Sequence, residues 1–297
     1  MDASLATGLR VFVAYVVLQY VLKRIVGRDR RTERFLHQFV FAFGIAALVA
    51  LIAGDVRVNA AFAIVAAIGF IAAGGTYLAW KAIALSQSRN ALFTFWDDAI
   101  AMGLSVWILR EGQFISPVIG IGIGLSFLSL LLFVRFSWRQ KDAKEKRSVP
   151  LRFYGYVLTY SISWGVAVFG QRYWSFHDMP VQTFVLAWYV GTLIAALLIY
   201  LLYTDPGDDQ RARTPFTAKD IGAHFFLALL IYVSLVLASF AYRAPVVVVQ
   251  PVFLVAEMII PALMGLYVFH ERKQFAPEEW AYFAIGFAGA LLVANGL

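Results

Sequence analysis

Ten runs of about twenty mostly apolar residues follow one another along the chain, and polar segments separate them. A helix of about 20 apolar residues spans the hydrocarbon core of a bilayer, so each run predicts a transmembrane helix. The pattern as a whole predicts an all-α polytopic membrane protein with ten transmembrane helices. The predicted spans are residues 5–25, 35–53, 60–82, 91–109, 117–136, 152–172, 181–203, 221–242, 246–269 and 280–296.

The composition supports the membrane class. Hydrophobic residues make up 61% of the 297 positions and charged residues only 14%, whereas about a quarter of the residues of a soluble domain are charged. The first apolar run has spanning length and lacks a small-residue cleavage site, so we expect no cleaved secretory signal. Since the chain has no cysteine, disulfides, thiolate metal sites and cysteine nucleophiles are excluded.

The basic residues predict an orientation rather than a nucleic-acid partner. The net charge is +7, but Lys and Arg cluster in residues 23–34 and 135–147, which follow the first and fifth spans. Segments after odd-numbered spans hold about twenty Lys and Arg, against about five elsewhere, and cytoplasmic loops are enriched in this way. We therefore expect an integral protein of a bacterial-type inner membrane, with both termini outside and the lipid bilayer as its surroundings.

The second half of the chain repeats features of the first half. The tetrapeptide AWKA at residues 79–82 and the tetrapeptide AYRA at residues 241–244 each end an apolar run. A shift of 160 positions superposes three pairs of less common residue types, and the two tetrapeptides correspond as well if two residues are allowed for a longer turn in the first copy. This predicts an internal duplication. These pairs are Asp97 with Glu257, Glu111 with Glu271, and Pro117 with Pro277.

The predicted copies each contain five spans. Because five is odd, the second copy enters the membrane from the opposite side, so the fold we expect is two inverted five-helix repeats. We place the first repeat at residues 1–137, a basic cytoplasmic linker at 138–150 and the second repeat at 151–297. Inverted repeats are typical of secondary transporters, whose site lies at the repeat interface.

The residues from 241 to 296 resemble the repeat unit of the drug/metabolite transporter superfamily, in particular its EamA-like members. In that unit a base ends the third span, as Arg243 does, and Gly-Glu or a close variant ends the fourth span, near Glu271. The sequence SWG at residues 163–165 also matches a frequent family feature. The family's Gly before Glu is Arg110 in one copy and His270 in the other. The resemblance implies a ten-helix metabolite carrier.

Asp97 and Glu257 are candidate site residues because each lies inside a predicted span. A carboxylate within the bilayer is costly, at about 2.5 to 3.5 kcal/mol on insertion scales, and is a functional-site hypothesis by default. Burial favours the protonated form, which a carrier of a coupling proton requires. The alternative is a structural carboxylate paired with a base. Asp98 points about 100° away from Asp97, so we expect at most one of the two to be centred on a cavity.

Other residues qualify through their position in the spans. Pro251 and Pro261 interrupt the ninth span, which makes Gln250 a candidate for lining a cavity. Lys81 and Arg243 end two spans, where they either bind an anionic group or extend to the lipid headgroups. We expect Glu111 and Glu271 to cap or brace loops. Four aromatic residues are candidates for contact with a substrate: Trp80, Trp96, Trp164 and Tyr242.

An enzyme is not expected, since the four histidines show no ligand spacing and no catalytic motif is present. We expect no cofactor and no metal. The function favoured by the pattern is secondary transport of a small polar or amphipathic, amino-acid-like metabolite by alternating access, with a proton as a candidate coupling ion. The alternatives are a non-transporting scaffold or lipid-handling protein of the same fold, and an ion channel. The sequence leaves monomer and homodimer open.

Overall fold

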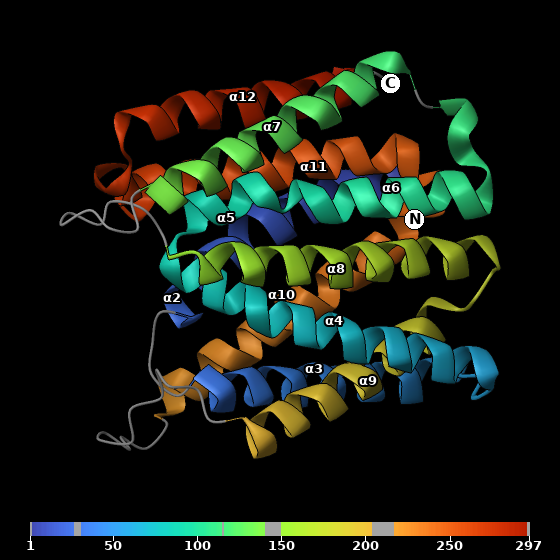
Figure 1. Cartoon of the computed structure of the whole chain (residues 1–297). Coiled ribbons are helices and arrows are strands. Elements are labelled where there is room, and N and C mark those ends of the chain that lie inside the picture. The colour runs from blue at the N-terminus through green and yellow to red at the C-terminus, as the bar shows by residue number, and fades with distance from the viewer. Residues whose placement is uncertain (1, 27–30, 115, 140–149, 204–216, 296–297) are drawn as a thin grey trace. The chain divides into compact units, whose positions relative to one another are not determined.

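The computed structural model describes residues 2–26, 31–114, 116–139, 150–203 and 217–295, and all their regular secondary structure is helical (Figure 1). Residues 140–149 of the predicted basic linker lie outside the described residues. The elements are α1 (Ala3–Arg10), η1 (Val11–Leu18), α2 (Gln19–Val26), α3 (Arg31–Ala53), α4 (Ala60–Leu85), α5 (Gln87–Phe93), α6 (Phe95–Leu109), η2 (Glu111–Phe114), α7 (Pro117–Arg139), α8 (Arg152–Phe176), α9 (Val181–Leu202), α10 (Ala218–Ala241), α11 (Val246–Leu263), η3 (Met264–Val268), η4 (Glu271–Gln274) and α12 (Pro277–Asn295).

Eight helical segments of the described residues are long and apolar enough to cross a membrane, by length and composition. The prediction of an all-α polytopic membrane protein is therefore confirmed, whereas the count of ten spans stays a prediction. The remaining two predicted spans do form long helices, α8 and α12, but α8 carries Gln171 and Arg172 and the first turn of α12 carries Glu278 and Glu279. The eight segments are Ala3–Val26, Arg31–Ala53, Ala60–Leu85, Gln87–Leu109, Pro117–Phe136, Val181–Leu202, Ala218–Ala241 and Val246–Val268.

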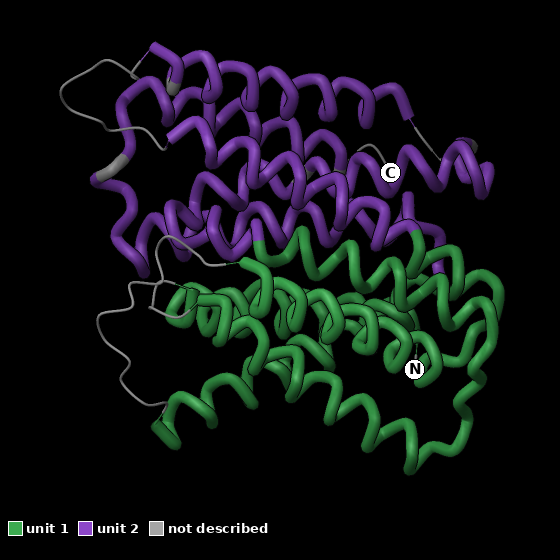
Figure 2. Tube along the Cα trace, turned by 60° about the horizontal axis from the view of Figure 1, so that its bottom comes forward, with its two compact units in different colours: residues 1–77, 170–243 green, residues 78–169, 244–297 purple. Residues whose placement is uncertain are grey.

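The chain folds into two compact units, and each unit takes helices from both halves of the sequence (Figure 2). Unit 1 contains residues 1–77 and 170–243, and unit 2 contains residues 78–169 and 244–297. Two of the three boundaries between the units fall within α4 and α8, and the third lies between α10 and α11. The units are thus a different division of the chain from the predicted repeats, which follow one another along the sequence.

In unit 1, α3 packs against α9 and α10, and α1 packs against α10. Glycine permits a close approach of α9 to the first part of α4: a Cβ atom on Gly191 would lie 1.8 Å from the carbonyl oxygen of Ala66. At the start of α10, the side chain of Thr217 accepts a hydrogen bond from the N–H of Asp220 and so caps the helix. Asp220 also pairs with Arg34 of α3 at 3.4 Å.

In unit 2, α7 and α12 lie side by side along their length (Figure 1), and α11 packs against α5, α6 and α12. Small residues allow the closest contact between α7 and α12, because a Cβ atom on Gly122 would lie 2.5 Å from the carbonyl oxygen of Gly289. A similar contact joins α8 to α6, where a Cβ atom on Gly165 would lie 2.6 Å from the side chain of Ile100.

The shift of 160 positions found in the sequence reappears in the local structure of unit 2. The short 3₁₀ helices Glu111–Phe114 and Glu271–Gln274 are separated by this shift, and so are the first residues of α7 and α12. The residues that precede the two 3₁₀ helices, Arg110 and His270, both adopt the left-handed conformation, with φ of 58° and 57°. This conformation favours glycine, so two non-glycine residues related by the shift share a backbone shape that side chains rarely adopt.

Candidate functional site

The fourth predicted span is two helices rather than one. α5 ends at Phe93, Thr94 forms a turn, and α6 begins at Phe95. Asp97 and Asp98 therefore lie in the first turn of α6, where the helix dipole favours negative charge. Discontinuous spanning helices of this kind often build the binding sites of membrane carriers.

Four polar side chains of α6 and α11 form a cluster, which we call the carboxyl cluster: Asp97, Asp98, Gln250 and Glu257. Asp97 is 3% exposed and Asp98 is 1% exposed, and the amide of Gln250 donates a hydrogen bond to the carboxylate of Asp98. The carboxylate of Asp97 accepts the N–H of Asp98 at 2.9 Å. Asp98 and Glu257 both lie close enough to Asp97 for their carboxyl groups to interact with it electrostatically.

The structure buries both Asp97 and Asp98, and Gln250 contacts Asp98. The expectation that at most one of the two aspartates is centred on a cavity stays a prediction. Helix α11, which carries Gln250 and Glu257, contains Pro251 and Pro261 and continues into a π-helix at Met264–Val268. Both helices that carry the cluster are therefore irregular within their spans.

Sequence reasoning missed several buried polar residues of α5 and α6. Gln87 and Asn90 lie three residues apart in α5, and Asp98 and Ser105 lie seven residues apart in α6, so each pair shares one face of its helix. Both amide atoms of Gln87, the Oδ1 atom of Asn90 and the Oγ atom of Ser105 are buried without a hydrogen-bond partner among the described residues. Buried polar atoms of this kind are normally met by water or a ligand. Gln87 and Asn90 could not be found from the sequence because the predicted fourth span begins at residue 91.

Two glutamates cap helices of the opposite half of the chain. The carboxylate of Glu271 accepts hydrogen bonds from the Ser86 hydroxyl at 3.0 Å and from the N–H groups of Gln87 and Ser88 at 2.9 Å each, so it caps α5. Glu111 accepts the N–H of Val246 at 3.2 Å and so caps α11. The two residues do cap helices, and each acts on a helix more than a hundred residues away in sequence.

A second missed feature is the buried ion pair between Arg89 of α5 and Glu279 of α12. Two guanidinium nitrogens of Arg89 donate to the two carboxylate oxygens of Glu279 at 2.8 and 2.7 Å. The guanidinium also lies 4.4 Å from the ring centroid of Phe275, and Glu279 accepts the N–H of Ala276. Since both charged groups are satisfied by partners, the pair holds the start of α5 against α12.

Four of the other predicted site residues lie in unit 2, on the three helices α4, α6 and α8. Trp80 is buried, and the Nζ atom of the buried Lys81 lies 5.7 Å from the ring centroid of Tyr156. Trp96 is half-buried, and its ring meets that of Phe127 edge-on with the ring centroids 5.2 Å apart. Trp164 is also half-buried, and its ring lies 6.3 Å from that of Tyr160.

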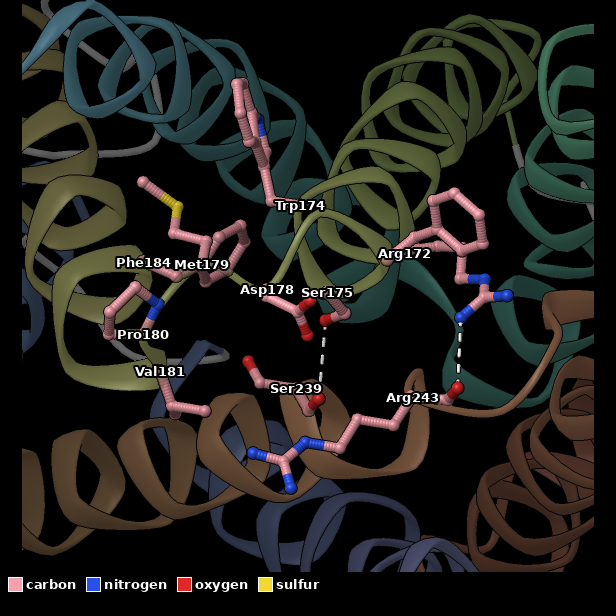
Figure 3. Close-up of a pocket in the computed structure, with 11 residues that line it drawn as sticks. Arg172, Trp174, Ser175, Asp178, Met179, Pro180, Val181, Phe184, Ser239 and Arg243 are labelled. Carbon is pink, nitrogen blue, oxygen red and sulfur yellow. Dashed lines mark hydrogen bonds between the residues drawn. The ribbon is translucent and has the colours of Figure 1, made fainter.

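Tyr242 and Arg243 belong to unit 1. Tyr242 is buried and its hydroxyl accepts a hydrogen bond from Arg10 at 3.2 Å. Arg172 of α8 donates to the carbonyl oxygens of Tyr242 at 2.7 Å and Arg243 at 3.1 Å. The exposed side chain of Arg243 lines a pocket of about 470 Å³ between the ends of α8 and α10 and the start of α9 (Figure 3). Thus, the predicted site residues divide between the two units.

The described residues include no group of three or more His, Cys, Asp or Glu side chains arranged to hold a metal ion. Neither a known protein family nor a curated protein matches the sequence. Solved structures do match. One of them, described as "Crystal structure of protein", has a TM-score of 0.64 with 12% identity, over 99% of this chain and 98% of that chain. At this identity the similarity shows a shared fold and carries no function.

Proposed function

We propose that the protein is a secondary transporter of a small polar or amphipathic, amino-acid-like metabolite. The observation that carries this proposal is the carboxyl cluster, which holds three acidic side chains together in helices of the membrane class. Such groups are costly within a bilayer, and they are usually found where a membrane protein moves ions or substrates. A scaffold has no need of them. We further propose that one of these carboxyl groups carries a coupling proton.

The correspondence between helices of the first and second halves of the chain supports a carrier built from two inverted five-helix repeats with ten spans in all. Helices that correspond in the two halves pack against each other within each unit: α3 with α9 in unit 1, and α7 with α12 and α6 with α11 in unit 2. Pairing of equivalent elements is what a pseudo-twofold axis produces. Together with the sequence resemblance, it favours membership of the drug/metabolite transporter superfamily and transport by alternating access.

Counterflow in proteoliposomes tests the proposal. Vesicles that contain the full chain are loaded with a mixture of amino acids and related metabolites, and uptake of each labelled compound is measured. We expect saturable uptake of at least one compound, strongly reduced in Glu257→Gln. The matched control is Glu278→Gln, which changes an exposed glutamate of α12 in the same unit and should transport normally.

Proton coupling is tested by Asp97→Asn in the same vesicles. If Asp97 carries the proton, this variant should keep exchange between the two sides but lose accumulation driven by a pH gradient, because exchange needs no net release of a proton. Absence of counterflow for every compound would argue against transport. Uptake that does not saturate would instead favour a channel.

A further inference from the structure

The pocket in unit 1 carries two opposite charges that the described protein leaves unpaired. Asp178 lies in the turn between α8 and α9, and Arg243 follows the end of α10 (Figure 3). Among the described residues, no ion pair or hydrogen bond engages the carboxylate of Asp178 or the guanidinium of Arg243. The Arg243 guanidinium lies 4.6 Å from the ring centroid of Phe240, which orients it without neutralising it.

Hydrogen bonds between α8 and α10 fix the wall that carries Arg243. The amide of Gln171 donates to the carbonyl of Leu235 and to the hydroxyl of Ser239, both at 3.1 Å. One turn later, the Ser175 hydroxyl donates to the carbonyl of Ser239 at 3.3 Å, as Figure 3 shows. Since Arg172 holds the carbonyl of Arg243 in addition, the backbone beneath this side chain is held from α8.

The opposite wall is shaped by the turn after α8. Asp178 has a φ of 53°, a left-handed conformation that Asp and Asn tolerate better than most residues. Pro180 then precedes the first residue of α9 and supplies no side-chain cap to the first N–H groups of this helix, which have no intrahelical partner. The apolar part of the lining comes from Trp174, Met179 and Phe184. A volume of about 470 Å³ is ample for a small metabolite.

We propose that this pocket binds a small molecule that carries both an anionic group and an ammonium group. The guanidinium of Arg243 takes the anion, the carboxylate of Asp178 takes the ammonium, and the apolar residues take the remainder of the molecule. This rests on the proposed function, which it deepens: the substrate class becomes a zwitterion of the α-amino-acid type, and unit 1 holds a binding site for it apart from the carboxyl cluster. The headgroup of phosphatidylethanolamine shares the same chemistry.

Equilibrium binding to the purified full chain in detergent tests the proposal with two labelled probes, a mixture of α-amino acids and O-phosphoethanolamine. We expect Arg243→Gln and Asp178→Asn each to weaken binding about ten- to hundredfold, as loss of a charge-assisted hydrogen bond does. Arg243→Lys should weaken it less, because the charge remains. The matched controls are Arg57→Gln and Asp55→Asn, an exposed pair at 3.7 Å in the same unit, which should leave binding unchanged.

A des-amino analogue separates the two roles. The corresponding carboxylic acid should bind the wild type more weakly than the amino acid does, and Asp178→Asn should weaken its binding no further. Amino-acid binding that needs both charges assigns the pocket to the substrate, whereas binding of phosphoethanolamine alone with the same dependence assigns it to a lipid headgroup. Binding of neither probe, or binding that ignores both substitutions, overturns the proposal. Counterflow that persists in that case would leave the proposed transport function standing.

Discussion

The cap that Glu271 places on α5 gives the sharpest stability prediction. Its carboxylate accepts three hydrogen bonds and is only 3% exposed. In Glu271→Gln the amide oxygen can replace one carboxylate oxygen, but the amide NH₂ then faces an N–H or hydroxyl donor. At least one buried donor is left unpaired, which costs about 1 to 3 kcal/mol, and the retained bonds lose the help of the charge. We expect the free energy of unfolding to fall by about 2 to 4 kcal/mol.

The assay is reversible unfolding in mixed detergent micelles, followed by helix content as SDS is titrated. Glu278→Gln is the control, because this exposed carboxylate lies seven residues away in the same unit and should change the free energy by less than about 0.5 kcal/mol. Equal stability of Glu271→Gln and the wild type would refute the capping argument. So would an equal loss in the two variants.

Three further predictions can be tested by the same unfolding assay or by the yield of folded protein on expression. Arg89→Leu should destabilise the protein by about 3 to 5 kcal/mol because it leaves Glu279 buried without its partner, whereas Arg89→Leu combined with Glu279→Leu should recover much of the loss. Gly191→Ala should reduce folded yield, since the new methyl group meets the α4 backbone, whereas Gly222→Ala in open space on α10 should stabilise by about 0.5 to 1 kcal/mol. Each half of a chain cut within residues 140–149 should misfold alone and recover folded yield on co-expression; folded, monodisperse separate halves would contradict this.

The positions of the eight long apolar helices could be predicted because they depend on runs of apolar residues, which are local. The start of the fourth span could not. Residues 86–90 read SQSRN, a polar sequence that looks like a loop, yet all five are buried. They are accommodated because Glu271 and Glu279, more than 180 residues away, supply acceptors and a counter-charge. No local pattern reveals such partners.

The candidate site was predicted in part for a similar reason. Asp97, Gln250 and Glu257 stood out because polar residues inside spans are rare. Asp98 was undervalued because the argument from helical spacing considered one helix alone, whereas α11 brings Gln250 to it. The pocket around Arg243 was not visible either, since it depends on how the turn with Asp178 folds beside the end of α10.

The two glutamate caps show why the halves of this chain depend on each other. In the water-free core of a bilayer, the first N–H groups of a helix need acceptors that another part of the protein supplies. Here Glu271 of the second half serves α5 of the first half, and Glu111 of the first half serves α11 of the second. Because α5 leads into the turn before Asp97 and α11 carries Gln250 and Glu257, each cap fixes the start of a helix that carries the carboxyl cluster. In the proposed carrier, the repeats would therefore complete each other's binding helices, which neither half could do alone.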